Sequence, residues 1–392
     1  MNYKNIFITG VTGFLGNELV KGLLKDYSDG NIYLLIRSNK RLKATERFDS
    51  YLNELSNDLA MDKAVLAERL QLVEGDVETP QFGLSDSAFQ DLAQKIDVIY
   101  HSAASVYLTA PLEIIRKTNV TGTLHVLRLG QLAMKKGGLK AFHHVSTAYI
   151  AGKRSGIIYE DDLDFGQKFN NNYEQCKFEA EKLVETYRSE LPITVFRPSI
   201  IMGDSKTGWT NAFNVLYEPM RMGYFNNLPI IPTSKKSIID IVPINFVSEA
   251  LLHLSHLDEG ISGKTFHLSI GQGRAISSIE FVRTVEKYVA EILEREQIKH
   301  GKLSHPIMLH PVLFQILSHI ALPISWGKPK QYMQKMLTYS DYVMNYKEFN
   351  NKECLRLLEG SGIVAPKVQD YLQIICEYCI KMNFGRAVKR SV

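Results

Sequence analysis

A glycine-rich turn near the N-terminus constrains the fold more than any other stretch of the chain. A short apolar run, Ile6-Phe7-Ile8-Thr9, leads into Gly10-Val11-Thr12-Gly13-Phe14-Leu15-Gly16, and apolar residues then recur at helical spacing up to Leu24. This pattern predicts a strand, a tight turn and a helix. Glycine tolerates positive φ and lets a phosphate approach the backbone, and the N-terminus of the helix points free N–H groups at that phosphate. We therefore expect residues 10–16 to bind the phosphates of a cofactor, with an ordinary strand-to-helix turn as the alternative.

Strand and helix patterns alternate for about the first 150 residues, which is typical of a parallel sheet with helices on both faces. Buried strands are predicted after the glycine turn at 31–37, 70–76, 97–101, 141–147 and 192–198, with a polar-faced helical region at 42–70. We predict an α/β protein with a Rossmann-type, doubly wound parallel sheet. Residues 1–204 would form this domain, and residues 205–392 a smaller, mostly helical substrate-binding part whose strands return to the sheet before about residue 270, as at 265–269.

Several residues at the predicted strand ends are suited to a dinucleotide, because ligands of such sheets bind outside the carboxyl ends of the strands. Arg37 ends the second strand, with Lys40 and Arg41 nearby and no acid, which favours the 2′-phosphate of NADP(H) over the free hydroxyl of NAD(H). A solvated basic loop is the alternative. Further cofactor contacts are predicted at the ends of the third and fourth strands and at the next helix: Asp76, Val77, Ser102, Ala103, Ala104 and Asn119.

Composition and charge exclude several other classes of protein. A net charge of +4 over 392 residues gives no indication of a nucleic-acid partner. Four cysteines in a chain of this length predict no disulfide framework and indicate a reducing compartment, so a cytoplasmic location is expected. The first strand begins within a few residues of Met1, which leaves no room for a signal peptide. No uninterrupted apolar run of about 18 residues occurs, so we expect no membrane-spanning helix.

A tyrosine and a lysine follow the fifth predicted strand in a spacing that suggests chemistry. Tyr173 and Lys177 lie four residues apart in a helical pattern and therefore on one helical face, 26 residues after Thr147 at the strand end. Ser146 is expected to point to the opposite face of that strand. Three histidines also lie at strand ends, at 101, 143 and 144, but no cysteine or acid completes a metal-binding pattern, so we interpret them as structural and expect no metal.

Taken together, these segments resemble the extended short-chain dehydrogenases/reductases, whose motifs recur here in order across residues 4–270. The matching segments are 9–16, Asp76, 101–104, 119–123, 145–147, Tyr173 with Lys177, and 197–199. Gly-Phe-Leu-Gly at 13–16, His-Ser-Ala-Ala at 101–104 and Arg-Pro-Ser-Ile-Ile-Met-Gly-Asp at 197–204 are most similar to the thioester reductase and fatty acyl-CoA reductase branch, the male-sterility type. Asn245 departs from this branch, which has an acid there; we expect the change to affect helix capping more than chemistry.

The resemblance implies roles for individual residues. Tyr173 would donate the proton, Lys177 would stabilise the phenolate and bind the nicotinamide ribose, and Thr147 would polarise the substrate carbonyl. Pro198 and Ser199 would flank the nicotinamide carboxamide. The implied activity is the NADPH-dependent reduction of fatty acyl-CoA or carrier-protein-bound acyl thioesters to an aldehyde, with further reduction to an alcohol left open.

Two other functions are compatible with parts of the sequence. A hydroxysteroid-type dehydrogenase or a nucleotide-sugar epimerase or dehydratase would share the fold, but Arg37 disfavours the NAD-retaining epimerases and the acyl-reductase-like segments disfavour both. A non-catalytic NADP-binding regulator would not need the intact set of Thr147, Tyr173 and Lys177.

The C-terminal part has two features that the motifs do not explain. Residues 305–325 are apolar but interrupted by proline and histidine, and three interpretations stay open: a core helix, a wall of an acyl-chain tunnel, or a surface anchor that contacts a membrane peripherally. Cys376 and Cys379 form a CxxC in an amphipathic pattern, which we interpret as half-buried helical cysteines rather than a redox or zinc site. The oligomeric state is not determined by the sequence.

Overall fold

The main sheet has seven parallel strands, six of them from residues 5–198 and one from 265–268. The computed structural model describes residues 3–27, 30–108, 110–225, 229–257, 260–298, 303, 305–344 and 346–385. The sheet strands are β1 (Asn5–Thr9), β2 (Asn31–Ile36), β3 (Leu70–Glu74), β4 (Val98–His101), β5 (Ala141–Val145), β7 (Ile193–Pro198) and β12 (Thr265–Leu268). Their spatial order is β12-β7-β5-β4-β1-β2-β3, which confirms the predicted doubly wound sheet.

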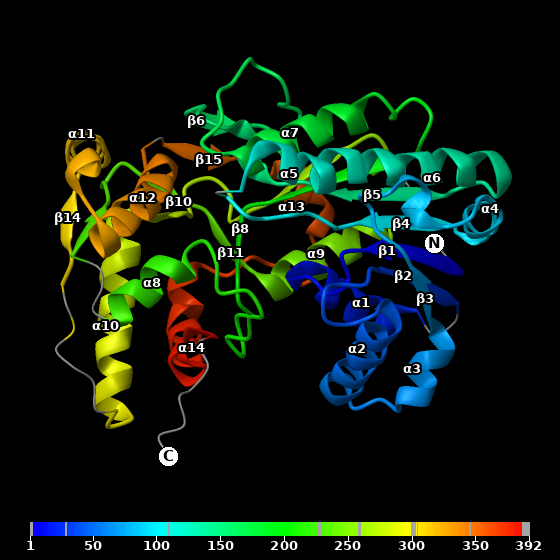
Figure 1. Cartoon of the computed structure of the whole chain (residues 1–392), viewed down its shortest axis with the longest axis horizontal. Helices are drawn as coiled ribbons and strands as arrows, with labels where there is room; N and C mark the ends of the chain where they lie inside the picture. The colour runs from blue at the N-terminus through cyan, green and yellow to red at the C-terminus, as the bar shows by residue number, and fades with distance from the viewer. Residues whose placement is uncertain are drawn as a thin grey trace.

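Helices cover both faces of this sheet because its strands are apolar on both sides. Helices α1 (Phe14–Asp26), α2 (Ala44–Leu59) and α9 (Ile244–Ser255) bury leucines and valines of one core against one face. Helices α4 (Asp86–Lys95), α6 (Gly122–Lys136) and α7 (Asn172–Glu185) pack a second core against the other. Figure 1 shows these two layers above and below the strands.

The topology reverses between β1 and β4, which lie side by side at the centre of the sheet. The connections that follow these two strands run to opposite faces of the sheet, so a crevice forms beyond the carboxyl ends of β1 and β4. The glycine turn follows β1, the loop 102–105 follows β4, and Thr147 lies two residues beyond β5. The residues predicted to be functional are therefore gathered at one edge of the sheet.

The C-terminal part forms a second layer of helices beside the sheet, on the left in Figure 1. Its apolar cluster is built mainly from α8 (Tyr217–Tyr224), α10 (Ser278–Arg295) and α14 (Val368–Lys381). Short strand pairs connect it to the first part: β8 (Ile200–Met202) with β11 (Ile241–Pro243), and β6 (Gly156–Ile158) with β15 (Lys347–Phe349). The late strand β12 joins the edge of the main sheet beside β7. Helix α13 (Lys352–Leu358) packs against β12 and α9.

Most predicted elements are present, and two regions differ in detail. Residues 42–70 form two helices, α2 and α3 (Lys63–Arg69), because Ala60 adopts a left-handed conformation with φ 51° that ends the first one. The apolar stretch 305–325 forms a short strand, β14 (Ile307–Leu309), the helix α11 (Pro311–Ala321) and a 3-10 turn. Helix α12 (Gly327–Tyr342) follows.

The predicted helical cysteines lie on α14, but they are fully buried rather than half-buried. Burial raises the pKa of the Cys376 thiol to about 12 and that of Cys379 further, so both are held as thiols. Among the described residues, no helix combines the length and the apolar character that crossing a bilayer requires.

Candidate active site

The glycine turn between β1 and α1 leaves no space for side chains. Gly10 has φ 77°, and a Cβ there would lie 2.7 Å from the backbone nitrogen of Ala103 in the loop after β4. A Cβ at Gly16 would lie 2.1 Å from the carbonyl oxygen of Gly10. Gly13 precedes α1 as its N-cap, where no side chain satisfies the free N–H groups of the first turn. A bare turn with unsatisfied amides fits the diphosphate of a dinucleotide.

The side chains around this turn divide between the crevice and the core. Thr12 is exposed, while Leu15 is buried in the core, so only its backbone can meet a cofactor. The Phe14 ring packs on Trp209, with ring centroids 5.6 Å apart, and so links the turn to the segment after β8. Phe14 therefore contributes to the wall of the crevice rather than to phosphate binding.

Two arginines lie at the end of β2, where the adenosine ribose of a dinucleotide is expected. Arg37, which the sequence singles out, forms an ion pair with Asp76 at 3.0 Å. Arg47 on α2 donates to the Arg37 carbonyl oxygen and, at 3.3 Å, to the hydroxyl of Thr12 in the glycine turn. Burial and the charge of Arg37 lower the pKa of Arg47. Sequence inspection missed Arg47, although its place in the first turn of the helix after the Arg37 loop is a signal that could have found it.

The loop after β4 is held in place by buried polar side chains. Asn119 accepts a 2.7 Å hydrogen bond from the Ser105 amide and donates to the Ser105 carbonyl oxygen, so both ends of its side chain are engaged with this loop. It lies in a π-helical turn, Lys117–Thr121, between α5 (Leu112–Arg116) and α6. Ser102, Ala103 and Ala104 are half-exposed beside Gly10. Asn119 thus shapes the crevice from behind.

Val77 is likewise buried, and its side chain lies where a Cβ on Gly122 would touch it.

Thr147, Tyr173 and Lys177 come together beyond the end of β5. Thr147 donates to the Pro198 carbonyl oxygen at 3.3 Å, and its hydroxyl is a neighbour of that of Tyr173, whose pKa it lowers. Lys177, one helical turn after Tyr173, donates a 2.7 Å hydrogen bond to the carbonyl oxygen of Val145. Thr147 comes from the turn after β5 and the other two from α7, so positions up to 30 residues apart in the sequence lie together.

Burial shifts the pKa values of the two titrating groups in opposite directions. It raises the pKa of Tyr173 to about 12, and the neighbouring hydroxyl of Thr147 opposes this shift. It lowers the pKa of Lys177 to about 8, against the attraction of Glu181. Lys177 is thus charged at neutral pH but close to losing its proton, and Tyr173 is a neutral hydroxyl that can donate.

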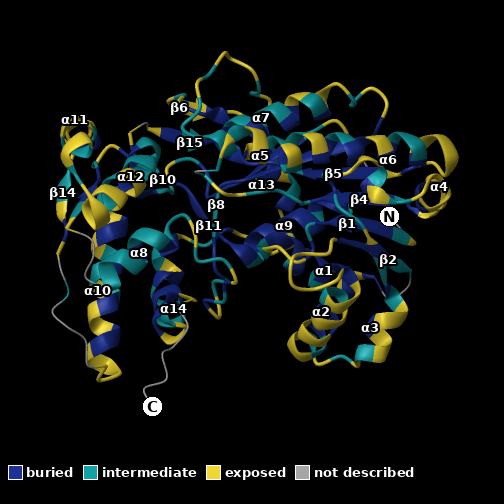
Figure 2. Cartoon of the chain, in the orientation of Figure 1, coloured by how far each residue is buried: buried dark blue, intermediate teal, exposed yellow. Residues whose placement is uncertain are grey.

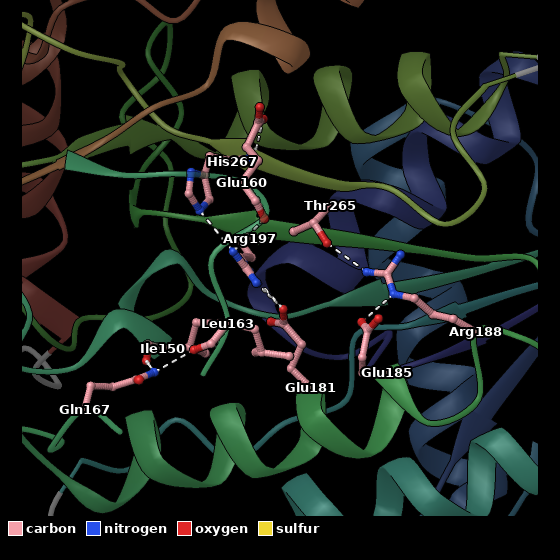
Figure 3. Close-up of polar contacts among 10 residues, drawn as sticks. All are labelled: Ile150, Glu160, Leu163, Gln167, Glu181, Glu185, Arg188, Arg197, Thr265 and His267. Atoms are coloured by element: carbon pink, nitrogen blue, oxygen red, sulfur yellow. Dashed lines mark hydrogen bonds and ion pairs between the residues drawn. The ribbon is translucent and has the colours of Figure 1, made fainter. Parts of the chain in front are cut away.

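A buried ion pair fixes the helix that carries Tyr173 and Lys177. Arg197 on β7 donates to the Glu181 carboxylate with an Nε–Oε1 distance of 2.9 Å, and to the carbonyl oxygen of Glu160 at 3.0 Å (Figure 3). Both charged side chains are almost completely buried. Glu181 lies four residues after Lys177, so the pair holds α7 against the strand that ends at Pro198. The backbone amide of Ser199 donates to the carbonyl oxygen of Leu268 at the end of β12, and the Pro198 carbonyl oxygen accepts from Thr147, which brings Pro198 beside the candidate site.

Histidines near the crevice are buried within the sheet. His101 bridges the hydroxyls of Thr9 and Thr123 at 2.8 and 2.9 Å, and burial lowers its pKa to about 3. His143 lies between the rings of Tyr100 and Phe196, and its pKa is also lowered to about 3. Within the described ranges, no three histidine, cysteine or acidic side chains are grouped as metal ligands.

The departure at Asn245 has a different consequence from the one expected. Asn245 does not cap α9, whose N-cap is Pro243. Its side chain instead accepts a 2.9 Å hydrogen bond from the Ser205 amide and donates to the Ser205 hydroxyl. An amide supplies both a donor and an acceptor here, whereas an ionised acid would only accept. Asn245 therefore ties the loop after β8 to α9.

Two pockets are lined by residues that neighbour Thr147 and Tyr173 in the sequence; an acyl-chain tunnel wall at 305–325 was one interpretation of the sequence, and the polar pocket was not predicted. One is an apolar cavity of about 120 Å³ between the sheet and α8, α10 and α12, lined by Tyr149, Ile200, Met220, Val285 and Tyr342 among others. Tyr149 follows Thr147 by two residues, and its ring packs edge-on against Tyr342. The other is a polar pocket of about 500 Å³, lined by Asn170, Asn171, Asn172, Gln315 and Thr338 among others. Asn171 donates to the Tyr342 hydroxyl at 2.8 Å, so the two pockets meet beside the start of α7.

Comparison with known proteins places these features among reductases. Residues 8–251 match the model of a family described as male sterility protein. The chain is 32% identical over 277 residues to the nonribosomal peptide synthetase asaC of Aspergillus flavus, covering 67% of this chain and 26% of that protein. It is 28% identical over 283 residues to a putative fatty acyl-CoA reductase of Drosophila melanogaster, covering 64% of this chain and 51% of the relative. The chain thus spans about a quarter to a half of these relatives.

Solved structures share the fold over nearly the whole chain. The terminal R domain from the myxalamid PKS-NRPS biosynthetic pathway has a TM-score of 0.77 and 25% identity, covering 98% of this chain and 92% of that one. A UDP-glucuronic acid 4-epimerase from Bacillus cereus has a TM-score of 0.64 at 18% identity, covering 96% and 99% of the two chains. The second likeness concerns the fold alone.

Proposed function

The chain belongs to the male sterility protein family, and on this premise we propose that it is an NADPH-dependent reductase of acyl thioesters, with the acyl group carried by CoA or by a carrier protein. The observation that supports the reaction best is the cluster of Thr147, Tyr173 and Lys177 beyond the end of β5. Tyr149, two residues after Thr147, lines an apolar cavity. A hydroxyl pair beside an apolar cavity suits an acyl carbonyl whose hydrocarbon chain lies in the cavity.

The residues of the cluster divide the chemistry between them. Bound NADPH supplies the hydride that reduces the acyl carbon. Thr147 and Tyr173 each carry a hydroxyl beyond the end of β5, so both can donate hydrogen bonds to the oxyanion that develops on the carbonyl oxygen, Thr147 in place of its present bond to Pro198. Tyr173 can then pass its proton to that oxygen, and the charge of Lys177 stabilises the phenolate left behind. Collapse of the resulting hemithioacetal breaks the C–S bond, which releases a thiol and an aldehyde.

Support for the phosphorylated cofactor comes from the two arginines beside the glycine turn. A 2′-phosphate carries up to two negative charges, and Arg37 and Arg47 together offer guanidinium donors at the end of β2. Gly10, Gly13 and Gly16 would face the diphosphate, and residues 102–104, Pro198 and Ser199 would flank the nicotinamide ribose and carboxamide. Arg37 would exchange its present partner Asp76 for the phosphate, leaving Asp76 to accept from the adenine amino group.

Support for a thioester comes from the second pocket. Its amide side chains, Asn170, Asn171, Asn172 and Gln315, can pair with the two amide groups of a pantetheine arm. CoA and acyl carrier proteins share that arm, so the pocket fits either donor. We assign residues 1–204 to the cofactor and residues 205–392 mainly to the acyl group, and we place the protein in the cytoplasm, where its four free, buried thiols would stay reduced.

The direct test follows NADPH oxidation at a constant enzyme concentration with four substrates in turn: palmitoyl-CoA, a carrier-loaded acyl group, a hydroxysteroid and a nucleotide sugar. The proposal expects oxidation with at least one thioester and formation of the aldehyde. Oxidation with neither thioester would refute it, and turnover of the steroid or the sugar would instead support another activity of the same fold. Val285→Phe narrows the apolar cavity, so it should shift preference from palmitoyl-CoA toward butyryl-CoA if the acyl chain lies there.

A further inference from the structure

Helix α11 exposes an apolar face to solvent. Val312, Leu313, Ile316, Leu317 and Ile320 follow helical spacing on one side of the helix, and all five are exposed, Ile320 to 66%. The opposite side is buried through Pro311, Phe314 and Ser318. Helix α11 thus has apolar residues on both sides, whereas a surface helix of a globular protein normally turns polar residues outward. The core-helix interpretation of this stretch is therefore wrong for its outer side.

The exposed apolar surface continues beyond the helix. Ile324 in the following turn and Trp326 before α12 are both exposed, Trp326 to 85%, and Ile307 on β14 is exposed as well. We call the five α11 residues together with these three the outer apolar face. Figures 1 and 2 show α11 at an outer corner of the molecule, distant from the main sheet and coloured largely as exposed.

Asp341, near the end of α12, accepts a 2.9 Å hydrogen bond from Gln315 on α11, but the segment that carries the outer apolar face has no acid of its own. Neither aspartate nor glutamate occurs in the sequence between Glu296 and Asp341. Lys328 and Lys330 directly follow Trp326, are exposed, and form no ion pair with the described residues. Lys335, further along α12, already pairs with Glu218 and is not counted here.

We propose that the outer apolar face inserts into the interface of an anionic lipid bilayer, with Lys328 and Lys330 contacting the headgroups. Aliphatic side chains with an exposed tryptophan and flanking lysines are the combination that a bilayer interface accepts. A protein partner would call for hydrogen-bonding groups across the contact. The outward side chains of α11 supply almost none, apart from His319. With 11 residues, α11 is too short to span the hydrocarbon core, so the contact is peripheral.

The segment proposed to contact the membrane lies next to the apolar cavity, a relationship that goes beyond the proposed reaction. Phe314, on the buried side of α11, packs in one cluster with Met336, and Met336 lines the apolar cavity. His305 and Pro306, just before β14, also line that cavity. The segment that would rest on the membrane is therefore the outer wall beside the cavity, which places the cavity close to the lipid phase.

Vesicle co-sedimentation of the full chain tests the proposal. The wild type should bind phosphatidylcholine vesicles that contain about 30% phosphatidylserine, and bind them less in high salt. The double variant Ile316→Asp/Ile320→Asp should lose on the order of tenfold or more of this binding, because it places two charges in the apolar interface. Lys328→Gln/Lys330→Gln should weaken binding to the anionic vesicles on the order of 20-fold, at about fivefold per lysine, and change binding to pure phosphatidylcholine little.

A matched control removes two equally exposed apolar residues from other faces. Ile114 and Val364 are 58% and 65% exposed, and Ile114→Asp/Val364→Asp should bind vesicles like the wild type. Turnover of a water-soluble, short-chain acyl thioester should be equal in all variants. Vesicle binding does not depend on turnover, so it tests the membrane proposal even where the proposed reaction fails. Three results would overturn the proposal: no vesicle binding by the wild type, equal loss in the control, or a dimer or carrier-protein complex that Ile316→Asp/Ile320→Asp disrupts while vesicle binding is absent.

Discussion

The ammonium group of Lys177 donates a 2.7 Å hydrogen bond to the carbonyl oxygen of Val145, the last residue of β5. Through this bond α7 is joined to the strand end that continues into Thr147, so the lysine both carries charge and sets the spacing of the two hydroxyls. Glu181, one turn further along α7, is held by Arg197 and raises the pKa of Lys177 against the effect of burial.

We expect kcat/KM for thioester reduction to fall as the pH rises through about 8. The pKa of Lys177 is lowered to about 8, so above that pH the side chain loses the charge that stabilises the Tyr173 phenolate. Lys177→Met should lower kcat/KM about 100-fold or more at pH 7 and abolish the decrease of kcat/KM at high pH. Glu181→Gln should move this decrease to lower pH, since it removes the neighbouring negative charge. A decrease that persists in Lys177→Met would come from the titration of another group.

Tyr173→Phe should lower kcat by about 10²- to 10⁴-fold, because it removes the proton donor but preserves the ring. Thr147→Ala should have an effect on the order of 10²-fold through the lost oxyanion hydrogen bond, and Thr147→Ser should recover part of it. NADPH affinity, measured by fluorescence titration, should change only a few-fold in each variant. Tyr187→Phe, at a half-buried tyrosine two residues beyond the end of α7, is the matched control. Wild-type turnover in Tyr173→Phe would overturn its role.

Arg37→Ala and Arg47→Ala should each raise KM for NADPH about tenfold, as expected for a charge-assisted hydrogen bond worth about 1.5–3 kcal/mol. KM for NADH should stay nearly the same, because NADH lacks the 2′-phosphate. Arg128→Ala removes an exposed arginine from α6 and should alter neither value. Equal rates of the wild type with NADH and NADPH would contradict the assignment.

Removing one partner of the buried Arg197–Glu181 pair should be strongly destabilising. Arg197→Leu leaves a buried carboxylate without its counter-ion, and we expect about 3–5 kcal/mol lower free energy of unfolding in urea titrations. The double variant Arg197→Leu/Glu181→Leu should recover much of that loss, since no unpaired charge is left behind. A double variant that is less stable than Arg197→Leu would show that the pair contributes more than its desolvation costs.

Acid should destabilise the protein through its buried histidines. The pKa values of His101, His143 and His267 are lowered to about 3, so between about pH 6.5 and 3 the unfolded chain binds protons that the folded chain does not. Their contribution to stability is complete above pH 6.5 and is lost as the pH falls, by about 2 kcal/mol per histidine at pH 5. Burial raises the pKa of Glu160 to about 7 and that of Asp240 to about 6, which acts in the opposite direction.

A comparison with one histidine removed isolates this effect. His143→Leu should lose about 2 kcal/mol less than the wild type between pH 8 and pH 5, whatever its stability at pH 8. The measurement is urea unfolding of both proteins at the two pH values. Identical losses would show that His143 stays neutral in the unfolded chain or is protonated in the folded one.

Local patterns predicted the sheet and the edge at which the candidate site residues gather. The strands from Ile6 to Pro198 are short apolar runs between turns, and their order along the chain dictates the doubly wound topology. Thr147 and Tyr173 were singled out by a strand end and a helical pattern, and the family resemblance supplied their expected roles. Asn119 was also found, but its role as the support of the 102–105 loop depends on a contact that no local pattern contains.

The sequence by itself determined the glycine turn and the strands, because each depends on residues close together in the chain. It also predicted the Thr147–Tyr173–Lys177 set, through a helical spacing and a family resemblance, although Thr147 and Lys177 are 30 residues apart. Only the tertiary structure decided that Arg47 lies beside Thr12, that Tyr149 and Tyr342 border an apolar cavity, and that α11 turns aliphatic side chains outward. Each of these three arrangements depends on which apolar or charged surfaces pack together, and the segments concerned lie far apart in the sequence. Composition is the same for a buried and an exposed apolar helix, and only the packing of the whole chain distinguishes them.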